Sequence, residues 1–145
     1  MRSKLMIAAA FAAVAALVLP AAVPAAGVKL EAALDGQEEV PDKGDPNGSG
    51  LAKVTVKRAQ KKVCSKITYE RIEVPNAAHI HKGKEGVAGP IKVTLFEGEF
   101  ESGDRECVKV SKRLARKIED KPANYYVNLH NAEFPDGAVR GQLES

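Results

Sequence analysis

The sequence lacks an excess of charge of either sign. Its 22 basic and 19 acidic residues leave a formal net charge of +3, which gives no electrostatic case for binding nucleic acid. No Gly-Lys-Ser or Gly-Lys-Thr follows the glycine-rich stretch 83–90, so a phosphate-binding loop is excluded. Serine, cysteine and aspartate are not arranged with histidine in a recognisable catalytic triad. We therefore predict that the chain is not an enzyme and has no nucleic-acid partner.

The amino-terminal stretch differs in composition from the rest of the chain. MRSK is a short basic start, LMIAAAFAAVAALVLP is uncharged, and AAVPAAG supplies small residues. This order is typical of a secretory signal peptide, so we predict a signal at residues 1–25 and one domain at residues 26–145. An apolar run of about 15 residues is short for a membrane-spanning helix, and a retained membrane anchor is the alternative. We predict a secreted or periplasmic protein with no membrane span after cleavage.

Cysteine is also scarce. Only Cys64 and Cys107 occur, and they do not form a CxxC motif, so they make a poor metal-binding set. Export leads to an oxidising compartment, where such a pair is more often bridged than free. We predict a structural disulfide between them, which closes a loop of about 40 residues and contributes about 3–4 kcal/mol to stability.

The chain does contain a hydrophobic pattern with a period of two. Apolar and polar residues alternate through segments 28–34, 52–57, 63–69, 91–95 and 125–130. Altogether about seven or eight short strands, separated by turn residues, are indicated. This pattern predicts an all-β fold, an antiparallel β-sandwich or barrel.

Two segments break that period. Residues 36–50 are rich in glycine, proline and aspartate and predict a loop, where Glu38 and Glu39 are poorly placed for acid–base catalysis. In residues 111–122, Ser111 can cap a helix whose apolar residues are four apart, and Pro122 can end it. We predict one short helix there, packed across the end of the sheets.

The three histidines share one side of the predicted strands. Residues alternate along a strand, so His79 and His81 point away from Ile80, which belongs in the core. By the same rule His130 points away from the core side, together with Asn128. If the two strands are neighbours, three imidazoles converge and leave an open coordination position for copper, zinc or nickel. The alternative is that the rings are solvated or bond a nearby loop.

Three polar residues near His130 in the sequence are further candidates. Asn128 and Glu133 are the nearest residues that could orient the rings. Arg140 alternates with Val139 and is predicted to face outward near His130. It could pair with Glu133 or Asp136, or grip an anionic group with both arms of its guanidinium. We therefore include Asn128 and Arg140 as candidate binding residues.

Four stretches together resemble the CHRD domain, the module named for chordin and also found in secreted microbial proteins. NAAHIHKGKEGVAGPIKVTLF resembles its histidine-containing segment, NYYVNLHNAEFPDGAVRGQL its closing motif, and LDGQEEVP with GSGLAKVTV its opening strands. The resemblance covers nearly all of residues 26–145. It implies an immunoglobulin-like or superoxide-dismutase-like Greek-key fold. The HxH pair is also similar to the copper-ligand strand of copper–zinc superoxide dismutases, but the chain lacks the further histidines of a two-metal site.

Two functions from different classes follow. The first is an exported binding or interaction module whose ligand, an extracellular or envelope partner, is unknown. The alternative is a metal-binding protein that holds copper or zinc between His79, His81 and His130. A third interpretation is a structural part of a larger extracellular assembly.

Overall fold

A computed structural model describes residues 26–145, so the predicted signal peptide lies outside the described residues. The strands are β1 (Val28–Asp35), β2 (Ser49–Lys57), β3 (Lys62–Glu70), β4 (Ala77–Lys82), β5 (Ile91–Glu97), β6 (Arg105–Lys109), β7 (Tyr125–His130) and β8 (Val139–Gln142). One α-helix, α1 (Lys112–Asp120), and three short 3₁₀ turns, η1 (Gly36–Glu38), η2 (Arg58–Gln60) and η3 (Pro122–Asn124), complete the described part. The prediction of an all-β fold with one short helix is confirmed.

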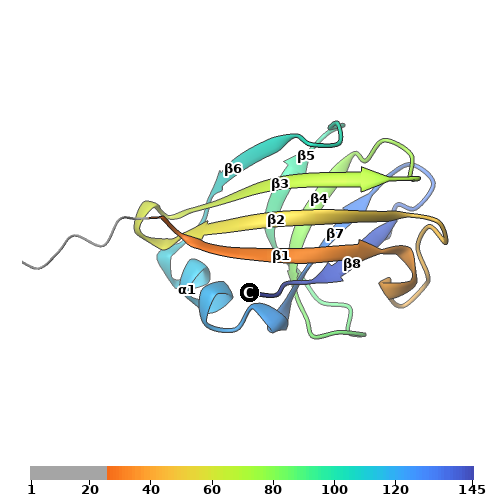
Figure 1. The fold of residues 1–145 in the computed structure, drawn as a ribbon. Coiled ribbons are helices and arrows are strands. Elements are labelled where there is room, and N and C mark those ends of the chain that lie inside the picture. The colour runs from red at the N-terminus through yellow and green to blue at the C-terminus, as the bar shows by residue number, and fades with distance from the viewer. Residues whose placement is uncertain (1–25) are drawn as a thin grey trace, which may run out of the picture.

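The strands form one curled antiparallel sheet. Its order is β5-β4-β7-β8-β1-β2-β3-β6, and the two outermost strands, β5 and β6, contact each other. The sheet is therefore a nearly closed barrel with two layers. Figure 1 shows β6, β3, β2 and β1 side by side in one layer, with β5, β4 and β7 behind them. The core lies between the layers, so each layer also has an outer face.

Alternation along the strands fills this core. Leu30, Val54 and Ile67 come from one layer, and Ile80 and Leu129 from the other, all with 1% exposure or less. Such burial of aliphatic side chains is the main stabilising term, at roughly 25 cal/mol for each Å² of apolar surface removed from water.

The helix closes one end of the barrel, as predicted. The Ser111 side chain caps it by accepting a hydrogen bond from the Leu114 backbone N–H at 3.1 Å, and Pro122 begins the next turn. Ala115 and Ile118 are its buried residues, so its apolar side covers the core. Within residues 26–145, no helix combines the length and the apolar character needed to cross a membrane.

The two cysteines are bonded to each other, which confirms the predicted disulfide. Cys64 on β3 lies directly opposite Cys107 on β6 in the antiparallel register. The bridge therefore fastens β6, which ends the sheet order of the described residues, to its neighbour β3.

Candidate metal centre

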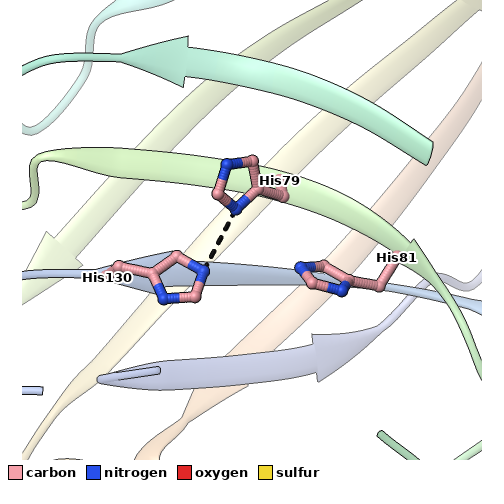
Figure 2. Close-up of side chains that lie close together, drawn as sticks. All are labelled: His79, His81 and His130. Atoms are coloured by element: carbon pink, nitrogen blue, oxygen red, sulfur yellow. Dashed lines mark hydrogen bonds between the residues drawn. The ribbon is translucent and has the colours of Figure 1, made fainter. Parts of the chain in front are cut away.

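The histidines lie on two neighbouring strands, as the metal hypothesis requires. In the register of β4 and β7, His79 is opposite Asn128 and Ala77 is opposite His130. The rings of His79, His81 and His130 stand on the outer face of this layer and turn toward one another (Figure 2). One potential ligand atom from each ring lies within 4.8 Å of the others. The register of β5 shifts beside both His79 and His81, and such bulges are common next to functional sites.

Backbone carbonyls fix the orientation of two of these rings. His81 Nδ1 lies 2.7 Å from the carbonyl oxygen of Gly89, and His130 Nδ1 lies 2.9 Å from that of Pro135. A carbonyl oxygen only accepts, so each Nδ1 carries the proton and each Nε2 keeps its lone pair. His79 Nδ1 is 3.1 Å from His130 Nε2. In the metal-free protein His79 Nδ1 therefore donates a hydrogen bond to His130 Nε2. The lone pairs of His81 and His130 are thus directed toward one region.

All three imidazoles are neutral at neutral pH. Burial, and then the nearby His130 and His81, lower the pKa of His79 to about 4. Burial also lowers the pKa of His81, against the bond to Gly89, which raises it. For His130, burial lowers the pKa, and the bond to Pro135 opposes this effect. Neutral imidazole is the form that binds metal ions.

Asn128 is buried between the histidines and Glu39. Its exposure is 3%, and its Oδ1 lies 3.1 Å from His130 Nε2. An amide oxygen facing a lone pair is unfavourable unless a proton or a cation lies between them. The structure thus places Asn128 beside the ring of His130, and its role as a binding residue stays a prediction. Glu133, in contrast, is exposed, and within residues 26–145 no hydrogen bond joins it to a histidine.

The prediction that Arg140 faces solvent and pairs with Glu133 or Asp136 is wrong. Its exposure is 2%, because residues 83–90, here called the covering loop, fold over this part of the sheet. Its Nη2 donates to the carbonyl oxygens of Lys84 at 3.0 Å and Val87 at 2.9 Å. Its Cζ lies 3.4 Å from the centroid of the Tyr126 ring, a favourable cation–π contact. The alternation of residues along the strand placed Arg140 on the correct face of the sheet, but it did not show that the covering loop buries this face.

Glu39 was missed by the sequence analysis, which placed it in a loop without a role. Its exposure is only 3%, and burial raises its pKa to about 7. The charge of Arg140 and hydrogen bonds from the Val40 backbone and the Asn128 side chain oppose this rise. A Cβ at Gly137 would lie 2.5 Å from Glu39 Oε1, so glycine there makes room for the carboxylate. In the sequence nothing distinguishes Glu39 from its neighbour Glu38.

Replacing Glu39 with glutamine is expected to remove a pH dependence of stability. The pKa of Glu39 is about 7 in the folded protein against an ordinary 4.5, so the folded state binds more protons between these values. Its contribution to the free energy of unfolding is therefore full below about pH 4.5 and is lost as the pH rises through 7. The wild type should lose about 2–3 kcal/mol more than Glu39→Gln between about pH 5 and pH 8.

Urea unfolding of the metal-free proteins at several pH values measures this difference. Glu38→Gln is the matched control, because Glu38 is the exposed neighbour and its replacement should leave the pH profile as in the wild type. Parallel profiles for the wild type and Glu39→Gln would contradict the assignment.

Comparison with known proteins gives one family. The model of the CHRD domain matches residues 30–143, which include all of the histidines, Glu39, Asn128 and Arg140. No curated protein and no solved structure matches the chain. The match spans both layers of the barrel and most of the sequence, so the chain belongs to the CHRD domain family.

Proposed function

We propose that this chain is an exported binding module that holds a copper or zinc ion between His79, His81 and His130. The observation that carries the proposal is the convergence of the three imidazoles, whose potential ligand atoms lie within 4.8 Å of one another. Hydrogen bonds from two Nδ1 atoms to backbone carbonyls support it, because such bonds orient histidine ligands in metal sites. Membership in the CHRD family supports a binding role in general.

The distances suit a first-row transition metal. At a metal–nitrogen distance of about 2.0–2.1 Å, two ligands at a tetrahedral angle lie roughly 3.4 Å apart. His79 Nδ1 and His130 Nε2 are 3.1 Å apart. The widest pair of ligand atoms lies within 4.8 Å, so an approach of at most about 1.4 Å brings His81 into range. Metal binding needs only that the proton of His79 move to its other nitrogen. Three neutral imidazoles favour zinc or copper over magnesium and calcium.

An unpartnered polar atom supports a bound cation at this place. Among the buried side-chain atoms of residues 26–145 without a hydrogen-bond partner is His81 Nε2. A buried lone pair of this kind is costly when nothing approaches it. A metal would satisfy it, and would also separate His130 Nε2 from Asn128 Oδ1. The Asn128 oxygen then lies where it can complete the coordination or hold a bound water.

We also propose that the protein is exported and that its metal serves binding. A disulfide between Cys64 and Cys107 is typical of exported proteins, which supports a secreted or periplasmic site. We assign the metal a binding role, in keeping with the binding role that membership in the CHRD family supports in general. An extracellular or envelope partner would then meet the metal-loaded module.

Isothermal titration calorimetry with Zn²⁺ and with Cu²⁺ tests the proposal. We expect one ion per chain with micromolar or tighter affinity, and a loss of about 100-fold or more in His81→Gln and in His130→Gln, because each removes a directed lone pair. Lys82→Gln is the matched control, since Lys82 is exposed on the same strand and should bind as the wild type does. No binding by the wild type, or unchanged binding by both histidine variants, would sink the proposal.

A further inference from the structure

A second surface stands out on the other layer of the barrel, away from the histidines. On the outer face of β2, β3 and β6, basic residues lie directly opposite one another in the antiparallel register. The pairs are Lys53 with Lys66, Lys66 with Arg105, Lys57 with Lys62, and Lys62 with Lys109. We call these six residues the basic face. Figure 1 shows the three strands that carry it side by side.

This arrangement opposes the stability of the sheet. Like charges at directly opposite positions destabilise neighbouring strands, and a merely solvated face usually mixes both signs. Within residues 26–145, only one residue of the basic face forms an ion pair: Lys53 lies 3.5 Å from Glu31. Both of these side chains are well exposed. The basic face is therefore a local concentration of charge in a chain whose total is near neutral.

The same face is hollowed. A depression of about 530 Å³ is lined by Lys53, Lys57, Lys66 and Arg105, together with Lys29. Two carboxylates, Glu31 and Glu106, also line it. The bridged cysteines Cys64 and Cys107 also line it, so the backbones of β3 and β6 are tied together beneath the cations.

The spacing suits an extended, repeatedly charged chain. Neighbouring strands are about 4.8 Å apart, and residues four positions apart along a strand are about 13 Å apart. The basic face thus presents two parallel rows of cations across three strands, with the bridged cysteines and Thr55 between the rows. Successive anionic groups of one polymer can contact both rows at once.

We propose that the basic face binds an acidic polysaccharide. Single-stranded nucleic acid is the weaker match, because bases stack on aromatic side chains and none from residues 26–145 lines the hollow. A lipid surface also fits poorly, because Val28 is the sole exposed large hydrophobic residue described on β1, β2, β3 or β6, and membrane binding uses apolar residues that insert. This proposal does not depend on the metal site.

Binding to polygalacturonate and to dextran sulfate, with uncharged dextran as the blank, tests the proposal. We expect the wild type to bind both acidic polymers, with an affinity that falls steeply as salt is added. Lys66→Glu should bind roughly tenfold more weakly with a shallower salt dependence. The same variant should melt at a higher temperature, because its carboxylate lies opposite Lys53 and Arg105.

The matched control is Lys82→Glu, which makes the same charge change at an exposed residue of the opposite layer. It should retain nearly all of the affinity. Lys62→Gln combined with Lys109→Gln removes two charges without reversing any and should also weaken binding. Equal losses in Lys66→Glu and Lys82→Glu would overturn the proposal, since the effect would then be one of net charge. Tighter binding to duplex DNA or to phosphatidylglycerol vesicles than to either polysaccharide would overturn it as well.

Discussion

Arg140→Ala is expected to lower the free energy of unfolding by about 3–5 kcal/mol at about pH 8, where Glu39 is ionised. The arginine is buried, with 2% exposure, and its charge is one of the factors that lower the pKa of Glu39. Its removal leaves a buried carboxylate without a cation. It also takes away both hydrogen bonds to the covering loop, at Lys84 and Val87.

The pH dependence separates the charge effect from lost packing. Without Arg140 the pKa of Glu39 rises further, so the variant loses stability more steeply than the wild type as the pH increases. At about pH 5 Glu39 is protonated in both proteins, and the difference between them should be smaller. Urea unfolding at both pH values provides the measurement.

Two further variants make the result specific. Glu39→Gln in the Arg140→Ala background should recover part of the lost stability, because the buried charge is then gone. Arg116→Ala is the control, since Arg116 pairs with Asp120 on the exposed side of α1 and such pairs contribute about 0.3–0.5 kcal/mol. A cost below about 1 kcal/mol for Arg140→Ala, or the same cost at both pH values, would contradict the coupling.

Replacing both cysteines with serine is expected to cost about 3–4 kcal/mol of stability. The bridge joins residues 43 positions apart, and closing a loop of this length in the unfolded chain accounts for that magnitude. The structure adds a second reason. Two like-charge pairs flank the bridge in the register of β3 and β6, Lys62 with Lys109 and Lys66 with Arg105. The disulfide therefore holds together two strands whose neighbouring side chains repel each other.

Salt distinguishes the two contributions. Repulsion between exposed cations is screened at high ionic strength, whereas the loop entropy is not, so the loss should be smaller in about 1 M NaCl than at low salt. Thermal and urea unfolding of the double variant and the wild type measure it. Dithiothreitol should destabilise the wild type by a similar amount and leave the double variant unchanged. A double variant as stable as the wild type would show that the bridge has no structural role.

Much of the fold and part of the site could be predicted from the sequence because both depend on local periodicity. Alternation placed Ile80 in the core and the flanking His79 and His81 on the other face, and the structure has this arrangement. Ser111 and Pro122 bounded the helix through their own backbone preferences, which are also local. The family resemblance rests on the same segments and is confirmed by the match over residues 30–143.

The environment of the site could not be predicted in this way. The alternation that turns Arg140 away from the core does not reveal that the covering loop folds over it and buries it. Glu39 belongs to a loop with the composition of an exposed turn, yet it is buried near Arg140 and Asn128. Contacts between segments about 50 or 100 residues apart leave no signal in either segment alone.

The basic face shows the same division. In the sequence these lysines are indistinguishable from ordinary solvent-exposed residues. Which of them lie opposite one another depends on how β2, β3 and β6 are aligned. By itself the sequence determined the strands, the helix, the facing of the histidines and the cysteine pair, since each follows from backbone preference or from composition. Only the tertiary structure decided which outward side chains meet, which are covered and which charges stand opposite one another, because these depend on strand order and register across the whole barrel.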